Sequence, residues 1–154
     1  MMLDHAWLLA HIPHQGSMCL LDTITDWDAQ RICCIASSHR DADNPLRAHG
    51  RLGAACGIEY AAQAMAAHGA LLASSEQPPR AGYLASVRSV DCRVTRLDDI
   101  HTDLEIEAER LSGDDNLILY GFRVSAAGRD LLTGRATVVL NADKLKTEQS
   151  RNAL

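Results

Sequence analysis

The sequence predicts an α+β fold in which one antiparallel sheet of about five to six strands is wrapped around one long central helix. Three observations lead to this prediction. Ala54–Leu72 carries eight alanines and is apolar on almost every side of a helix. Two short apolar stretches precede it, and several alternating stretches follow it. Because a surface helix keeps its apolar residues in one stripe, a helix that is apolar all round must be enclosed by the rest of the fold.

The first third of the chain supplies a short helix, two strands and a loop. Trp7–His11 is a candidate helix that stops before Pro13, since proline interrupts helical hydrogen bonding. Met18–Thr25 and Arg31–Ser38 are apolar runs of strand length, and we expect them to pair. His39–Leu52 is rich in Arg, Asp, Asn, Pro and Gly, which indicates a loop before the central helix.

After the central helix the hydrophobic pattern changes from a helical period to alternation. Ser74–Arg80 contains two adjacent prolines and is predicted to be a loop. Tyr83–Arg96 predicts a long strand. In Leu104–Glu109, apolar residues alternate with glutamates, so one face of this strand should be core and the other solvated.

The last part of the chain predicts a β-hairpin and a tail. Leu117–Ser125 and Leu131–Leu140 are strand-like, and Ala126–Arg129 between them has the composition of a tight turn. Residues 141–154 are charged and poor in apolar side chains, which is typical of a flexible terminus. We therefore expect one domain over residues 1–140.

Composition argues against several classes of function. A net charge of −5 over 154 residues argues against a nucleic-acid-binding surface. No apolar run reaches the roughly 20 residues that span a bilayer, and the first ten residues lack the pattern of a signal peptide. The five cysteines form an odd set without Cys-x-x-Cys spacing, as is usual in a reducing compartment. We expect a cytoplasmic protein that binds neither nucleic acid nor membrane.

The sequence gives no reason to expect a metal or a cofactor. His11 and His14 have a metal-like spacing, but they flank a proline and have no Glu or Cys partner nearby in the sequence. No glycine-rich loop of the kind that binds nucleotides is present.

The central helix carries a single carboxylate, Glu59, in its first turns. An isolated buried charge is too costly, so this side chain must be paired, be protonated or face a cavity. Gln63 lies four residues further on and shares its face. The alternative is that Glu59 reaches solvent near the helix start, where the macrodipole favours an acid. Glu59 is the first candidate for chemistry.

Three segments resemble one family. Ile12–Asp22 has a Pro-His followed by an apolar stretch that ends in Asp, Gly57–Met65 has a Glu followed four residues later by Gln, and Ala81–Val87 is the strand after the helix. The chain thereby resembles the hotdog-fold 3-hydroxyacyl-acyl-carrier-protein dehydratases of the FabA/FabZ type. It is most similar to the dehydratase-like proteins of aryl-polyene (xanthomonadin-type) pigment biosynthesis. The match spans about Leu8 to Leu140.

The resemblance implies a hydro-lyase that needs no cofactor and converts carrier-bound 3-hydroxyacyl thioesters to trans-2-enoyl thioesters. Glu59 would act on the hydroxyl side, which requires a raised pKa, and an apolar helix environment raises the pKa of a carboxyl. Gln63 would orient Glu59 or a water. Backbone amides around Ala55 and Gly57 would polarise the thioester carbonyl. Gly57 would also let an acyl chain approach the backbone, or would simply pack closely against a strand.

The chain departs from the family at the catalytic histidine. The FabZ-type pattern places it fourteen residues before the helix glutamate, and that position is Pro45 here. His49 is the local candidate for the missing base, with His14 and His39 behind it, and each of the three has a structural alternative. We expect His68 at the surface or a strand end.

In dimeric hotdog dehydratases the histidine and the acid of one site come from different subunits. The resemblance therefore implies a homodimer, or a heterodimer in which this chain supplies Glu59 and a paralogous hotdog dehydratase supplies the histidine. The acyl carrier protein would dock on loop arginines such as Arg40, Arg47 and Arg51, which are otherwise ordinary solvated surface. Two alternatives stay open, a non-catalytic acyl-binding subunit and an acyl thioesterase in which the helix carboxylate acts as base or nucleophile.

Overall fold

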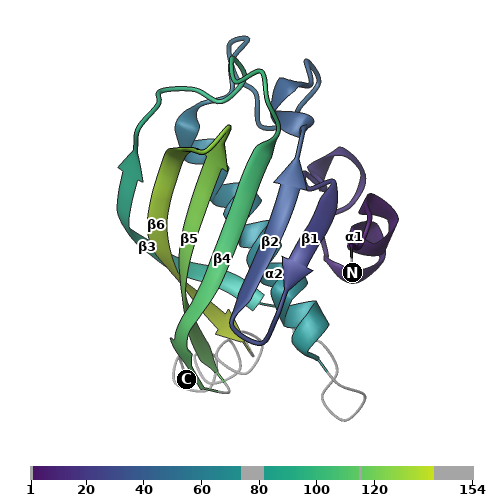
Figure 1. Cartoon of the computed structure of the whole chain (residues 1–154), viewed down its shortest axis with the longest axis vertical. Coiled ribbons are helices and arrows are strands. Elements are labelled where there is room, and N and C mark those ends of the chain that lie inside the picture. Colours follow the sequence, from purple (N-terminus) through teal and green to yellow (C-terminus); the bar gives the residue numbers. More distant parts are fainter. Residues whose placement is uncertain (1, 74–81, 115, 141–154) are drawn as a thin grey trace, which may run out of the picture.

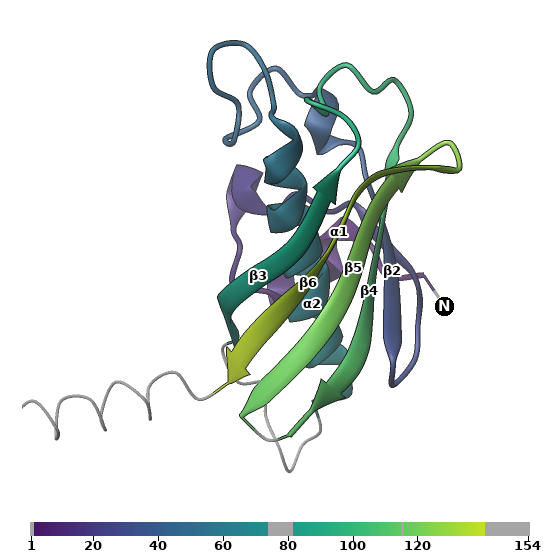
Figure 2. The ribbon, with the colours of Figure 1, turned by 90° about the vertical axis from the view of Figure 1, so that its left-hand side faces the viewer.

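The computed structural model describes residues 2–73, 82–114 and 116–140. Over these residues one six-stranded antiparallel sheet curves around one long helix (Figures 1 and 2). The strand order across the sheet is β1-β2-β4-β5-β6-β3. The elements are α1 (His5–His11), α2 (Gly57–Leu72), β1 (Thr23–Trp27), β2 (Arg31–Ala36), β3 (Gly82–Cys92), β4 (Leu104–Gly113), β5 (Leu117–Ala126) and β6 (Arg129–Leu140). Three short 3₁₀ turns complete them, η1 (Gly16–Met18), η2 (Ser38–Arg40) and η3 (Ala54–Cys56).

The α+β architecture expected from the sequence is confirmed in its order of elements. Two strands precede the long helix and four follow it. The predicted helix Ala54–Leu72 is present as the turn η3 continued by α2. The expected loop Ser74–Arg80 and the expected tail 141–154 lie outside the described residues. No helix in the described ranges has the length and apolar character needed to cross a membrane.

The first strand begins later than expected. Met18–Thr25 was predicted as a strand, but β1 starts at Thr23, and the residues before it form η1 and an irregular stretch. The reason is a side chain from the central helix. Gln63 accepts a hydrogen bond from the Leu20 amide at 2.8 Å and donates one to the Met18 carbonyl at 2.7 Å. These backbone groups are therefore satisfied by a side chain rather than by a neighbouring strand.

The strand after the central helix ends earlier than expected. Tyr83–Arg96 was predicted, and β3 ends at Cys92. Beyond it the backbone pairs with the loop that leads into α2, because the Ala54 amide donates to the Thr95 carbonyl at 3.1 Å and the Leu97 amide donates to the Leu52 carbonyl at 2.8 Å. This exchange of partners fixes the start of the central helix against the end of β3.

The final hairpin is confirmed. β5 and β6 are joined by Ala127 and Gly128, whose φ angles are 51° and 76°. Two consecutive residues with positive φ form the type I′ turn, whose twist matches that of the flanking strands. The alternation in β4 is confirmed as well, since Leu104, Ile106 and Ala108 are buried between more exposed glutamates.

The start of α2 packs against the inner face of the sheet through Gly57. A Cβ atom at this position would overlap Cδ2 of Leu132 on β6 and would lie 3.6 Å from Cγ2 of Val124 on β5. Both leucine and valine are fully buried. Gly57 is therefore a close-packing residue between helix and sheet.

Replacing Gly57 by alanine should destabilise the protein by about 1–3 kcal/mol, because the buried leucine must move to make room. Gly69 on the same helix is the matched control. Nothing lies within 4 Å of a Cβ built there, so Gly69→Ala should instead stabilise the helix by about 0.5–1 kcal/mol. Chemical denaturation of both variants measures the difference. Equal effects from the two substitutions would contradict the close approach at Gly57.

Candidate active site

The carboxylate of Glu59 and the imidazole of His14 form a pair. Glu59 lies in the first turn of α2, and His14 lies in the segment between α1 and η1. His14 Nε2 is 3.3 Å from Glu59 Oε1, and the two side chains are 25% and 33% exposed. Since an ionised carboxylate can only accept, His14 carries the proton on Nε2 and donates it. Sequence analysis singled out both residues, but it did not predict the contact between them.

Gln63 holds this pair in position. Its side chain is fully buried, and its Nε2 donates to Glu59 Oε1 at 3.3 Å as well as to the Met18 carbonyl. The same side chain thus connects α2, the carboxylate and the backbone that follows His14. The expected orienting role of Gln63 stays a prediction for catalysis, and the contacts supply its geometry.

The expectation of a raised pKa for Glu59 is wrong. The hydrogen bond from His14 lowers the pKa of this carboxyl below its ordinary value, and the hydrogen bond from Gln63 adds to that effect. Burial acts in the opposite direction and is outweighed. Both bonds go to Oε1. Glu59 therefore rests as a carboxylate, which is the form that accepts a proton.

A cavity of about 530 Å³ adjoins the pair. Glu59 and His14 lie on its wall together with a row of small α2 side chains, Ala62, Ala66, Gly69 and Ala70. The opposite wall comes from the strands, with Ile118 and Tyr120 of β5, Val138 and Leu140 of β6, and Leu84 of β3. Small residues on one side and aliphatic side chains on the other leave room for an elongated apolar ligand that ends at the carboxylate.

The other histidine candidates lie elsewhere. His49 is exposed in a tight turn with a φ of 55°, and no contact joins it to Glu59 in the described part of the chain. His39 is fully buried and donates from Nε2 to the Ile100 carbonyl at 3.0 Å, and burial lowers its pKa. Of the three histidines proposed as the base, the structure brings His14 alone to Glu59.

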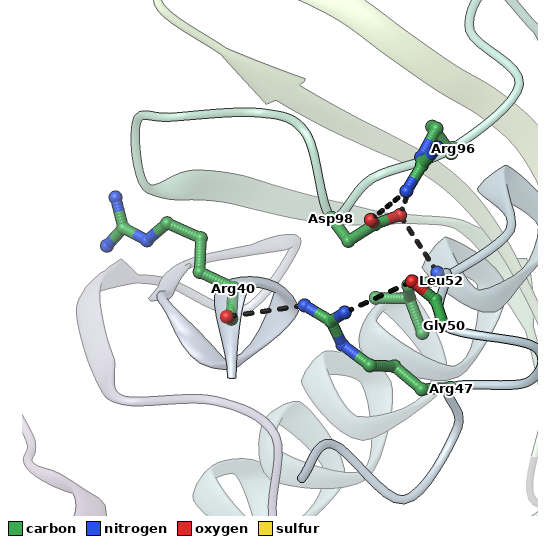
Figure 3. A network of polar contacts seen from close by, with 6 residues as sticks. All are labelled: Arg40, Arg47, Gly50, Leu52, Arg96 and Asp98. Carbon is green, nitrogen blue, oxygen red and sulfur yellow. Dashed lines mark hydrogen bonds and ion pairs between the residues drawn. The ribbon is translucent and has the colours of Figure 1, made fainter. Parts of the chain in front are cut away.

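The loop that contains Pro45 is held by arginines and one aspartate (Figure 3). The Arg47 guanidinium donates to the carbonyls of Arg40 and Gly50, and Arg96 pairs with Asp98, which also accepts from the Leu52 amide at 2.9 Å. The hydrogen bond from Arg96 holds the pKa of Asp98 far below its usual range. Arg40 reaches across to Asp103 at 2.6 Å. These arginines stabilise the loop internally, whereas Arg51 is exposed.

The backbone amides before α2 are mostly occupied. The Gly57 amide donates to the carbonyls of Ala54 and Ala55, and the Cys56 amide donates to Gly53. Neither Ala55 nor Gly57 belongs to the cavity wall. Gly57 is thus used in packing and at the helix start. Of the two amides expected to polarise the thioester carbonyl, that of Gly57 is occupied, and no partner for that of Ala55 is found among the described residues.

Two buried residues of the site region were missed by sequence reasoning. His68 was expected at the surface or at a strand end, but it is fully buried on α2, where it hydrogen-bonds to Tyr120 at 2.8 Å. Tyr120 was not singled out, because its position in an alternating strand predicts only that it faces the core. A histidine about three turns into α2 was the available signal, since burying it requires partners for both ring nitrogens.

Comparison with known proteins adds a family and a fold. The family model of ApeP-like proteins, described as ApeP dehydratase, matches residues 8–149. Among curated protein sequences, none matches this chain significantly.

Solved structures with similar folds fall into two groups. A chain of the dehydratase heterocomplex ApeI:P from Xenorhabdus doucetiae superposes with a TM-score of 0.79, at 22% identity, over 91% of this chain and 95% of that chain. A mutant thioesterase from Pseudomonas aeruginosa gives a TM-score of 0.64 at 14% identity, over 90% and 94% of the two chains. A hypothetical thioesterase with coenzyme A from Streptococcus pneumoniae gives 0.57 at 12% identity, over 77% and 84%. At these identities the likeness establishes the fold.

Proposed function

The chain belongs to the ApeP-like dehydratase family, and from this premise we propose that Glu59 and His14 remove water from a 3-hydroxyacyl thioester bound in the cavity. The product is the trans-2-enoyl thioester. One observation carries this assignment: a carboxylate with a lowered pKa and an imidazole N–H lie 3.3 Å apart at the wall of an elongated, largely apolar cavity.

The pair can supply both proton transfers of the reaction. Elimination removes a proton from C2, and the C3 hydroxyl leaves as water only if it receives a proton. Glu59 accepts the C2 proton, and His14 donates its Nε2 proton to the C3 hydroxyl, which leaves as water with the C3–O electron pair. After water has left, the proton on Glu59 returns to His14 across the 3.3 Å contact, which restores the starting state. This reverses the role that the family resemblance implies for Glu59, because a carboxyl with a lowered pKa rests ionised and has no proton to give to the hydroxyl.

The acyl chain would lie along α2. From Glu59 the cavity follows the row of Ala62, Ala66 and Gly69, where the absence of large side chains leaves space against the strands. The thioester end would then lie near the pair and point toward the opening. Delivery by an acyl carrier protein, and a substrate from fatty-acid-like or aryl-polyene biosynthesis, belong to this proposal.

A hotdog dehydratase partner would complete the cavity at the edge strand β3. The other edge of the sheet is covered, because Leu3 bridges to Ile24 of β1. The outer side of β3 is bare among the described residues, and Leu84 is 42% exposed there while also lining the cavity. An uncovered edge strand of this length is a ready site for strand pairing. The similar structure named above is itself a dehydratase heterocomplex, which supports a heterodimer over this edge.

The proposal is tested by incubating a carrier-bound 3-hydroxyacyl thioester with the purified protein, either alone or together with a paralogous hotdog dehydratase. The mass of the product is then measured by mass spectrometry. We expect loss of the mass of one water. Release of the free acid would show a thioesterase instead. No reaction in either arm, with the acyl chain retained on the protein, would show an acyl-binding subunit. Activity that does not change when the partner is added would contradict the heterodimer.

A further inference from the structure

The backbone of Leu20 is held on both sides by side chains. Its amide donates to Gln63 Oε1 at 2.8 Å, and its carbonyl accepts from the Ser38 hydroxyl at 2.8 Å. Leu20 and Gln63 are fully buried. A buried peptide group that loses its partner incurs the cost of desolvation, so these two hydrogen bonds fix the position of this backbone. The same bonds anchor the segment that carries His14, six residues before Leu20.

The Ser38 hydroxyl is itself fixed by Tyr60 and Asn44. Its one proton goes to the Leu20 carbonyl, so the phenol of Tyr60 donates to Ser38 Oγ in their 2.8 Å contact. Burial raises the pKa of Tyr60, so the phenol keeps this proton. Asn44 is 5% exposed, and its Nδ2 donates to the Tyr60 oxygen at 3.1 Å. These partners leave the Ser38 hydroxyl one orientation, toward the Leu20 carbonyl.

The contacts form one directed series of hydrogen bonds that ends at Glu59. Gln63 accepts from the Leu20 amide and donates from Nε2 to Glu59 Oε1. The two bonds at Leu20 are each 2.8 Å long, whereas Gln63 and His14 each lie 3.3 Å from Glu59 Oε1. A contact of the latter length is close to the limit for an N–H···O hydrogen bond. A small shift of Leu20 should therefore weaken the contacts at Glu59 first.

We propose that Ser38 is a positioning residue, which acts through Leu20 and Gln63 to hold the carboxylate and the imidazole of the site in their reactive geometry. Without the hydroxyl, the buried Leu20 carbonyl must turn toward another donor, and Gln63 follows the Leu20 amide. A misplacement of about 1 Å can cost about 10²-fold in rate even when the substitution is remote from the chemistry. This inference rests on the proposed function, in which Glu59 accepts the C2 proton.

Two adjacent serines allow a matched test. Ser37 and Ser38 are both half-buried, and each donates one side-chain hydrogen bond. Ser38 donates to the Leu20 carbonyl, and Ser37 donates to the Asp22 carboxylate at 2.6 Å. A hydrogen bond to a charged group is the stronger of the two kinds, so Ser37→Ala should lower the melting temperature at least as much as Ser38→Ala. A general loss of stability would therefore affect both variants.

Two measurements distinguish positioning from stability. The first is carbon-13 NMR of labelled glutamate carboxyls, recorded without substrate. The hydrogen bond from Gln63 helps to lower the pKa of Glu59, so this pKa should rise in Ser38→Ala and stay unchanged in Ser37→Ala. The second is the kinetics of dehydration. In Ser38→Ala we expect kcat to fall about five- to twentyfold and KM to change by less than about twofold, and Ser37→Ala should keep both constants.

Tyr60→Phe tests the preceding step of the same series. Its loss of the hydroxyl frees Ser38 to rotate but leaves the bond to Leu20 possible, so both effects should have the same sign as in Ser38→Ala and be smaller. If Ser38→Ala does not fold, Tyr60→Phe decides alone. An unchanged pKa of Glu59 in the folded variants would overturn the proposal. An equal rise in Ser37→Ala would overturn it as well.

The NMR measurement separates this inference from the proposed function. If the wild type dehydrates no thioester, but the pKa of Glu59 rises in Ser38→Ala and not in Ser37→Ala, the proposed reaction is refuted and the positioning role stands. If the wild type dehydrates its substrate, and neither this pKa nor kcat changes in Ser38→Ala, the positioning role is refuted and the reaction stands.

Discussion

Replacing Glu59 by glutamine should lower kcat/KM for dehydration by about 10²- to 10⁴-fold, because the group that accepts the C2 proton is lost. Glutamine keeps the length of the side chain, and its amide oxygen can still accept from His14 Nε2 and Gln63 Nε2, as Oε1 does at 3.3 Å in the native protein. The fold should therefore remain intact. The measurement is the rate of enoyl thioester formation, followed by mass spectrometry with thermal unfolding as a parallel check.

The matched control is Glu105→Gln on β4, an exposed glutamate outside the cavity wall. It removes the same charge from the protein, so its dehydration rate should equal that of the wild type. A Glu59→Gln variant that retains the wild-type rate would exclude Glu59 as the proton acceptor. A rate lost in step with the melting temperature would indicate misfolding rather than lost chemistry.

Much of the fold could be predicted because its signals are local. The apolar circumference of Ala54–Leu72 and the alternation in Leu104–Glu109 both report burial through the period of the chain itself. The errors arose where a distant group replaces a local partner. The stretch before Thr23 has the composition of a strand, but the side chain of Gln63, more than forty residues away, satisfies its backbone. Local pattern contains no information about such a contact.

The site residues likewise divide into one that a local signal identified and others that depend on contacts between distant segments. Glu59 was identified because a carboxylate is out of place on an apolar helix, which is a local anomaly. Its partner could not be found by counting, because spacing within the family pattern led to Pro45 and then to His49. His14 reaches Glu59 from the other side of β1 and β2 in sequence, through a contact that depends on how α1 and η1 pack on α2.

Substituting His14 should shift the titration of Glu59 in a direction that depends on the replacement. The hydrogen bond from His14 is the largest cause of the lowered pKa of Glu59, and burial opposes it. In His14→Ala the bond is gone and burial remains, so the pKa of Glu59 should rise. In His14→Gln an amide N–H can still donate, so the pKa should stay below its ordinary value. Carbon-13 NMR of labelled glutamate carboxyls measures both, with His101→Gln, an exposed loop histidine, as the control.

Replacing His14 should change both the activity and the stability of the protein, because both depend on its hydrogen bond to Glu59. Neither alanine nor glutamine can transfer a proton to the C3 hydroxyl, so dehydration should fall by about 10²- to 10⁴-fold in each variant. Because the native pKa of Glu59 lies below its unfolded value of 4.5, the pair stabilises the wild type above that pH. That contribution is lost as the pH falls through the native pKa. The difference in unfolding free energy between wild type and His14→Ala should therefore be largest near neutral pH and should shrink on acidification. A difference that grows toward low pH would show that His14 does not stabilise the carboxylate form of Glu59.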